Sequence, residues 1–417
     1  MTVRSGREFL AIPGPTTVPD AVLNAMHHPA VDIYSDELLG LTESCLADLR
    51  TIFRTTGSTY IYAANGHGAW EAALTNTLSR GDKILVLESG RFAIGWGEMG
   101  AGLGLEVEVL PGSHHAAVKP GTVTERLGQP DGADIKAVLV VQIDTASGVV
   151  NDIPAIRKAM DAAGSEALFM VDTIASLATM QFHMDDWRVD VAVSGSQKGL
   201  MTPPGLSFTA VGSKARKRHE TAGLVTPYWD WTAREEDEHY KKYCGTPPEH
   251  LLFGLRKGMD MILAEGLEAA WRRHALLAEA TRRAVDVWSR GGALAFNIAR
   301  PEERADSITM VRMLNGHQPA PLLHYCKEQC GVVLGVTIGD QAGEGFRIAH
   351  MGHVNAPMIL GTLSVIEMGL GALGIPHEAG GVQAAISYLA SQVPADGMAG
   401  AGLIEGNTGN CCGGPDH

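Results

Sequence analysis

A lysine and an aspartate that follow two apolar runs have the residue types that imine chemistry requires. Lys198 follows the strand-like run Val189–Val193 after a short polar turn, and Asp172 ends the run Ala167–Val171. A partly buried lysine amine can form an imine with an aldehyde. A carboxylate can keep a pyridine nitrogen protonated. For this pair alone, a helix-capping aspartate and a surface lysine are an equal alternative.

Three further segments offer groups that could bind an anion. Residues 65–69 (Asn-Gly-His-Gly-Ala) follow a strand-like run and open a helix, where bare backbone N–H groups suit a phosphate. Residues 144–148 (Asp-Thr-Ala-Ser-Gly) place hydroxyls after another run. Arg347 could clamp a carboxylate through two parallel hydrogen bonds. Taken singly, a tight turn, a polar turn and a surface arginine account for these segments as well or better.

The segment Gly95–Gly100 formally matches the GxGxxG dinucleotide fingerprint, but its context disagrees. Its first glycine lies eight positions beyond Leu87 (95 − 87), where the strand-like run ends, whereas the fingerprint needs the turn at once. Trp96 would also crowd a pyrophosphate. We interpret Trp96 as a platform for an aromatic ring, with a core tryptophan as the equal alternative.

The elements that must position these residues alternate along the first two thirds of the chain. Near-continuous apolar strands separated by helices predict an α/β fold with a mostly parallel seven-stranded sheet, covered on both faces. Ligands of such sheets bind at the carboxyl ends of the strands. The strand-like runs are Tyr60–Ala63, Lys83–Leu87, Leu105–Leu110, Ala137–Gln142, Ala167–Val171, Val189–Val193 and Leu206–Val211.

The pattern divides the chain into four parts. Residues 1–18 read as an irregular arm, 19–265 as the large domain, and 266–393 as a smaller C-terminal α/β domain joined by a long helix. Residues 394–417 are rich in Gly, Ala and Asn and are expected to be disordered. In the smaller domain we expect strands near Ala293–Ile298, Ser307–Met313 and Phe346–His350, and closing helices near Pro357–Leu373 and His377–Ser391.

Composition excludes several classes of protein. The formal net charge of −14 argues against nucleic acid or an anionic membrane as a partner. The six cysteines form no regular framework, and neither HExxH nor CxxC occurs, so we expect no metal site and a reducing compartment. No secretory segment is evident, and the apolar run Met358–Leu373 is too short to span a bilayer. We predict a soluble, cytoplasmic protein.

Two motifs together resemble those of a known enzyme family. Ser194-Gly195-Ser196-Gln197-Lys198-Gly199 matches a cofactor-lysine motif, and residues 171–177 (Val-Asp-Thr-Ile-Ala-Ser-Leu) match a pyridine-acid motif. The chain resembles class V, fold-type I pyridoxal-phosphate aminotransferases of the serine/alanine–glyoxylate branch. The resemblance runs from Pro13-Gly14-Pro15-Thr16 to the closing helices and leaves out only the tail.

The resemblance implies a role for each site residue. Lys198 would bind the aldehyde of pyridoxal 5′-phosphate, Asp172 would pair with the ring nitrogen, and Thr145 would lie near the ring hydroxyl. Trp96 and Ile174 would pack on the two ring faces. The remaining expected contacts are Gly66, His67 and Gln197 on the phosphate, Tyr243 and Thr246 on the phosphate of the neighbouring subunit in a homodimer, and Arg347 with the backbone near Gly14 on the substrate carboxylate.

The sequence departs from this family at four places. Asn65 stands where serine is usual, Asp144 replaces a glutamate, and Gln142 replaces a common histidine. Relatives in this branch usually carry a histidine–arginine pair where this chain has residues 31–35 (Val-Asp-Ile-Tyr-Ser). That segment lies near the substrate in the family, so the departure bears on substrate identity and leaves the cofactor assignment in place.

We therefore expect a ping-pong aminotransferase that moves an amino group from serine, alanine or aspartate to glyoxylate and yields glycine. Three alternatives remain. A sulfur-abstracting lyase of the same class would need a reactive cysteine, for which Cys330 is the nearest candidate. A nicotinamide oxidoreductase would use Gly95–Gly100. A catalytically inactive relative would serve as a binding protein.

Overall fold

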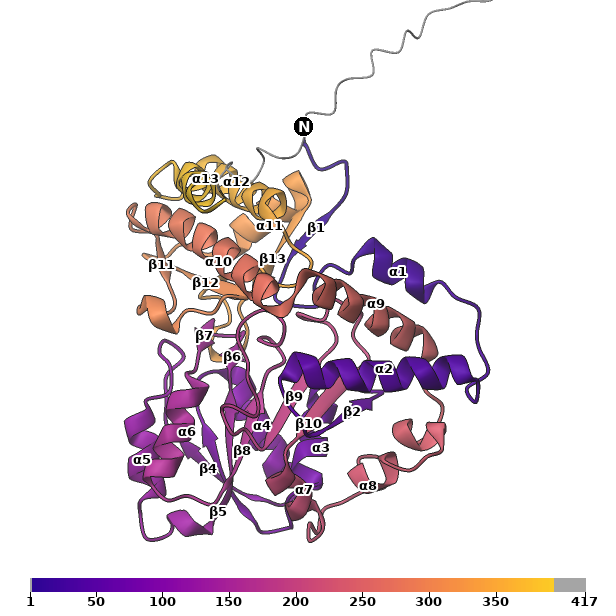
Figure 1. Ribbon diagram of the computed structural model, residues 1–417. Coiled ribbons are helices and arrows are strands. Elements are labelled where there is room, and N and C mark those ends of the chain that lie inside the picture. Colours follow the sequence, from indigo (N-terminus) through magenta and orange to yellow (C-terminus); the bar gives the residue numbers. More distant parts are fainter. Residues whose placement is uncertain (1, 394–417) are drawn as a thin grey trace, which may run out of the picture.

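The computed structural model describes residues 2–393, which build one large sheet, one small sheet and a two-stranded ribbon, with covering helices (Figure 1). In the large sheet only β10 runs antiparallel to its neighbours, and the other pairs are parallel. All seven strands lie within two residues of the predicted runs, and the predicted fold class is confirmed. In spatial order they are β2 (Ser58–Tyr62), β10 (Ser207–Val211), β9 (Val191–Gly195), β8 (Leu168–Asp172), β5 (Ile135–Val141), β3 (Lys83–Leu87) and β4 (Glu106–Leu110).

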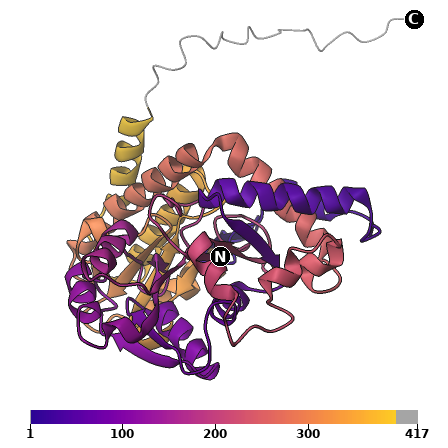
Figure 2. The same cartoon turned by 60° about the horizontal axis from the view of Figure 1, so that its bottom comes forward.

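The large sheet is apolar on both faces because alternate side chains of its strands enter different cores. In β3, Leu85 and Leu87 belong to one core, and Ile84 and Val86 to the other. The first core is covered by α2 (Asp36–Phe53), α5 (Pro120–Leu127), α6 (Ile153–Ala162) and α9 (Glu249–Glu265). The second is covered by α3 (Gly66–Thr75) and α4 (Arg91–Gly102). The long helix α2 lies beside α9 in both views (Figures 1 and 2).

The small sheet takes its edge strand from the start of the chain. Residues 1–18 were predicted to be irregular, yet Phe9–Ala11 form a strand parallel to residues 332–334. Three apolar residues are too few to show a strand period in sequence. The sheet order is β1 (Phe9–Ala11), β13 (Val332–Val336), β14 (Gly345–Ala349), β12 (Ile308–Met313) and β11 (Leu294–Phe296). Its helices are α10 (Leu267–Ser289), α11 (Pro319–Cys330), α12 (Ala356–Ala372) and α13 (Gly381–Gln392).

Shorter elements complete the described chain. The helices α9 and α10 meet at Gly266, next to the predicted boundary at residue 265, and the division into domains stays a prediction. The predicted disorder of 394–417 lies outside the described residues. Within residues 2–393, every helix is too short or too polar to cross a bilayer. The shorter elements are α1 (Asp20–Met26), β6 (Ile143–Asp144), β7 (Val149–Val150), α7 (Ser213–His219), α8 (Trp231–Arg234) and 3-10 turns at Gly132–Asp134, His239–Tyr243, Pro301–Glu303 and Gly339–Gln341.

Candidate active site

A cavity of about 320 Å³ opens where β5, β8 and β9 end, at the carboxyl edge of the large sheet. Eight of the residues predicted from the sequence to form the site lie in its wall: Gly14, Gly66, His67, Thr145, Asp172, Ile174, Gln197 and Lys198. The other lining residues are Pro15, Asn65, Trp70, Phe92, Val141, Ile143, Ala175 and Pro204. Chain segments from several different elements therefore meet at the position that sheet topology favours for a ligand.

The environment of Lys198 favours its neutral amine. Burial lowers the pKa of Lys198 to about 8, and the positive charge of Arg347 acts in the same direction. Its Nζ donates a hydrogen bond to the carbonyl of Pro13. The N-terminal arm can lie this close because residue 14 is glycine, with φ of +96°. A Cβ at Gly14 would stand 2.5 Å from Lys198 Nζ, so any other residue would displace the lysine.

Asp172 is a buried acid held by two neutral donors. The Ile174 backbone N–H donates to Oδ1 and the Trp70 indole N–H donates to Oδ2, each at 2.7 Å. Burial raises the pKa of Asp172 to about 7, although both hydrogen bonds oppose that effect. Its carboxylate forms no ion pair within residues 2–393. A buried carboxylate without a counter-ion fits the protonated ring nitrogen that we expected here from the sequence.

The N-terminus of α3 offers free donors to the same cavity. Asn65 caps this helix, and its Oδ1 accepts from the Gly68 N–H at 3.4 Å. The N–H groups of Gly66 and His67 have no acceptor among the described residues. A Cβ at Gly66 would overlap the Cδ1 atom of Ile174, so any other residue there would push the end of this side chain aside. Unpaired N–H groups at a helix N-terminus suit a phosphate.

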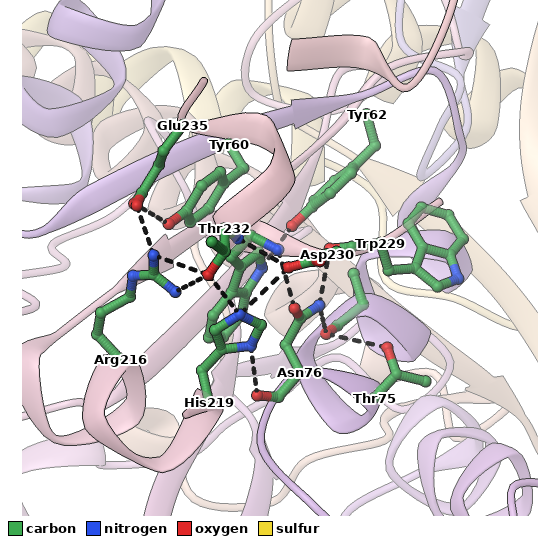
Figure 3. A network of polar contacts seen from close by, with 12 residues as sticks. Tyr60, Tyr62, Thr75, Asn76, Arg216, His219, Trp229, Asp230, Thr232 and Glu235 are labelled. Carbon is green, nitrogen blue, oxygen red and sulfur yellow. Dashed lines mark hydrogen bonds and ion pairs between the residues drawn. The ribbon is translucent and has the colours of Figure 1, made fainter. Parts of the chain in front are cut away.

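A polar network anchors the segment that covers the start of α3. Asn76, at the end of this helix, donates to the carbonyl of Trp229 and accepts from the N–H of Trp231 (Figure 3). The indole of Trp231 donates to Tyr62 at 2.9 Å. Fixed in this way, the ring of Trp229 lies so close to Gly68 that a Cβ there would stand 2.9 Å from it. The network therefore closes one side of the turn that opens α3.

Arg347 lies in β14, just behind the cavity wall. Its Nε donates to the carbonyl of Val336 at 2.7 Å, and its Nη1 donates to the carbonyl of Thr145 at 2.8 Å. Burial lowers the pKa of Arg347 to about 10, opposed by the negative charge of Asp144, so the guanidinium stays charged at neutral pH. Its Nη2 makes no hydrogen bond within residues 2–393. The side chain is thus held by two carbonyls with one donor group left for a carboxylate.

Trp96, expected from the sequence to pack on the cofactor ring, is not among the residues that line the cavity. It is fully buried in the core between α3 and the sheet, where it stacks on Trp70 with 5.9 Å between ring centroids. Phe92, one helical turn earlier in α4, lines the cavity instead. Our sequence interpretation placed the aromatic platform one helical turn later, at Trp96 between Gly95 and Gly97. Phe92 follows the end of β3 at Leu87 by five positions (92 − 87), whereas Trp96 follows it by nine (96 − 87). Because ligands bind near strand ends, this shorter separation could have identified Phe92 from the sequence.

Asp144 fixes the start of α4 and so positions Phe92 at the cavity. The helix has no side-chain cap of its own, because Gly90 precedes it. Asp144 Oδ2 accepts instead from the N–H groups of Phe92 and Ala93, at 2.8 and 3.3 Å. A Cβ at Gly90 would overlap this carboxylate. The acid that replaces the family's glutamate therefore acts as a helix cap from a neighbouring strand.

Two expected phosphate ligands lie away from this chain's own cavity. The hydroxyl of Tyr243 is buried and lies 2.9 Å from Thr42 Oγ1, whereas Thr246 is exposed. His239, in the same segment, bonds to the carbonyl of Ile33 at 2.8 Å. The turn that contains His239 therefore lies beside Ile33, outside the cavity. Their role at a neighbouring subunit stays a prediction.

The residues on which two alternative functions depend lie in structural positions outside the cavity. Gly95–Gly100 lies inside α4, and Gly97 and Gly100 face Val86 and Ile84 so closely that a Cβ would stand 2.9 and 2.7 Å from them. These glycines allow the helix to pack on the sheet. Cys330 ends α11 away from the cavity, and burial raises the pKa of its thiol, which disfavours the reactive thiolate.

Known proteins resemble this chain over most of its length. The Aminotransferase class-V family matches residues 9–344. A serine–glyoxylate aminotransferase of Methylorubrum extorquens is 39% identical over 395 residues, 93% of this chain and 97% of the relative. An L-aspartate–glyoxylate aminotransferase of Paracoccus denitrificans is 36% identical over 376 residues, 90% and 94% of the two chains. The crystal structure of pyridoxamine–pyruvate aminotransferase from Mesorhizobium loti superimposes with a TM-score of 0.85 at 25% identity, covering 94% of this chain and all of that one.

Proposed function

The chain belongs to the class-V aminotransferase family, and from this premise we propose that it transfers the amino group of a small amino acid to glyoxylate, with pyridoxal 5′-phosphate as cofactor. The observation that carries the proposal is one cavity holding Lys198 and Asp172, with Arg347 behind its wall. Relatives named for serine and for L-aspartate both have glyoxylate in their names, which supports glyoxylate as acceptor. The donor stays among serine, alanine and aspartate.

The cavity residues fit the cofactor group by group. When bound, it supplies an aldehyde carbon and an electron-accepting ring. Lys198 would hold the aldehyde carbon, and Asp172 would keep the proton on the ring nitrogen. The ring would pack between Phe92, which replaces Trp96 in this role, and Ile174. Its phosphate would lie at the free N–H groups that open α3, with Gln197 beside them.

The reaction then needs one proton carrier and one carboxylate anchor. The neutral Nζ of Lys198 can take the proton from the α-carbon of the amino donor, because its pKa near 8 leaves part of the amine unprotonated at neutral pH. Arg347 would bind the α-carboxylate through charge-assisted hydrogen bonds and so orient that carbon toward the lysine. Thr145, which Arg347 holds by its carbonyl, lies in the same wall.

We also propose a homodimer in which Tyr243 and Thr246 act at the neighbouring subunit's phosphate. Their position outside this chain's own cavity supports that assignment, and the exposure of Thr246 leaves it accessible to a second subunit. The cytoplasmic location rests on the irregular cysteine pattern and stays a prediction.

An absorbance titration tests the proposed function. The protein loaded with pyridoxal phosphate should show a visible band that falls on adding serine, alanine or aspartate and returns on adding glyoxylate. Lys198→Ala should lose both the band and turnover. A wild-type protein that binds no pyridoxal phosphate would refute the cofactor assignment. A band indifferent to all three donors would refute the substrates alone.

A further inference from the structure

We propose that Trp70 is a positioning residue, whose indole N–H holds Asp172 ionised and facing the cavity and thereby sets the proton affinity of the cofactor's ring nitrogen. The inference rests on the proposed function, because it concerns the partner of Asp172 in the loaded enzyme. Trp70 was not among the residues predicted from the sequence. It lies four positions after Gly66, one turn along α3, and therefore on the same face as the phosphate loop.

The hydrogen-bond pattern selects one protonation state of Asp172. Each carboxyl oxygen faces one donor, the Trp70 indole at Oδ2 and the Ile174 backbone at Oδ1, each at 2.7 Å. An ionised carboxylate accepts both bonds. A protonated one would turn an O–H toward an N–H at one of its oxygens and lose that bond. Since Asp172 is buried, the loss could not be made up by water.

Aromatic packing fixes the indole in this orientation. Trp70 is 1% exposed and stacks on Trp96, with an interplanar angle of 14°. Phe92 packs against its edge at 6.4 Å between centroids, and the ring of His67 lies at 4.5 Å on the cavity side. With neighbours on three sides, the indole cannot turn its N–H away from the carboxylate without disturbing this core.

A neutral donor has a specific advantage at this position. A lysine or arginine here would neutralise Asp172 and compete with a protonated ring nitrogen for its charge. An indole stabilises the anion and leaves the charge available. The charged groups whose fields reach Asp172 act in opposite directions, because Asp144 disfavours its ionisation and Lys198 favours it. Trp70 adds a directed contact that does not depend on either of them.

The chain supplies a matched control in Trp96. Both tryptophans are buried in the same stack, but the Nε1 of Trp96 has no hydrogen-bond partner among the described residues. Trp70→Phe and Trp96→Phe therefore remove similar volumes and one indole N–H each. Only the first removes a hydrogen bond to the site. An effect of core packing would appear in both variants. Because Trp70 also lines the cavity, the change in ring protonation, rather than the Kd alone, identifies the loss of the bond.

The test uses holoenzyme loaded with pyridoxal phosphate carrying ¹⁵N in the ring. The ¹⁵N chemical shift, followed against pH, reports the ring proton, and equilibrium dialysis gives the cofactor Kd. In Trp70→Phe the ring should lose its proton at lower pH, and Kd should rise about 10- to 100-fold, as expected for one hydrogen bond to a charged group. Trp96→Phe should match the wild type in both measurements.

The outcomes separate this inference from the function on which it rests. If Trp70→Phe and Trp96→Phe behave alike in both measurements, the inference is overturned while the aminotransferase assignment stands. If the wild type binds no pyridoxal phosphate, the proposed function falls first. Should Trp70→Phe fail to fold, benzothienylalanine at position 70 keeps the shape of the indole with sulfur in place of N–H. The same shift in ring protonation is expected there, and its absence would overturn the inference.

Discussion

Replacing Asp172 by asparagine should make the cofactor-free protein more stable relative to the wild type as the pH rises. Burial raises the pKa of Asp172 from 3.8 to about 7. The unfolded chain therefore ionises this group at lower pH than the folded protein does. Folded stability falls as the pH rises between these two values, and the loss is complete above the folded pKa. Asparagine does not titrate and so avoids this loss.

The size of the effect follows from the folded pKa. When the pH is raised from about 5 to about 8, the free energy of unfolding of the wild type falls until the pH reaches the folded pKa near 7 and is constant above it. The loss therefore accumulates over about two pH units. At 1.36 kcal/mol per pH unit, this is on the order of 2–3 kcal/mol. The variant also leaves either the Trp70 or the Ile174 N–H facing an amide NH₂, at a cost of about 1–3 kcal/mol. That cost does not depend on pH, so the change between the two conditions is diagnostic.

Urea unfolding of the cofactor-free proteins at both pH values measures this change. Asp185→Asn is the control. Partial burial raises the pKa of Asp185, but hydrogen bonds from Thr55 and Thr56 outweigh it and lower the pKa below its usual value. Asp185 is therefore ionised in the folded and in the unfolded protein from about pH 5 to about pH 8. Its difference from the wild type should stay constant. A constant difference for Asp172→Asn as well would refute the buried-acid reasoning.

Two further predictions concern ligand contacts. Arg347→Ala should raise the KM for the amino donor about 10- to 100-fold, because a charge-assisted contact to the substrate carboxylate is lost. Arg347→Lys keeps a point charge and should restore part of this loss. Unchanged steady-state kinetics in Arg347→Ala would show that Arg347 does not bind the substrate. Phe92→Ala should raise the Kd of pyridoxal phosphate about 2- to 10-fold through loss of ring packing, as measured by dialysis. An effect as large in Trp96→Phe would contradict the assignment of Phe92.

The parts of the fold that could be predicted from sequence are those with a repeating physical signal. Most strands of the large sheet show a near-continuous apolar run, and the turn glycines follow them. Lys198 and Asp172 could be identified because each closely follows such a run, and strand ends meet at one edge of a parallel sheet. Gly66, Thr145 and Gln197 could be predicted for the same reason, because each follows a strand of the large sheet closely, and all three line the cavity.

The features that the sequence did not predict depend on contacts between distant segments. Whether Phe92 or Trp96 faces the cavity is set by the rotation and depth of α4, whose start is held by Asp144 from another strand. The bond from Trp70 to Asp172 joins residues 102 positions apart. β1 pairs with the free edge of β13, and its three residues are too few to show a strand pattern in the sequence. No local pattern carries the bond from Trp70 or the pairing of β1.

The pairing of β1 with β13 has a consequence for synthesis on the ribosome. Ala11 leaves the ribosome 321 residues before Val332, its partner segment's first residue (332 − 11). At about 5–20 residues per second, the first strand waits roughly 15–65 s for the edge that completes it. During this interval Pro13 and Gly14, which close over Lys198, are not yet tethered by the small sheet. The small sheet can therefore fix Pro13 and Gly14 over Lys198 only after residues 332–334 have been translated.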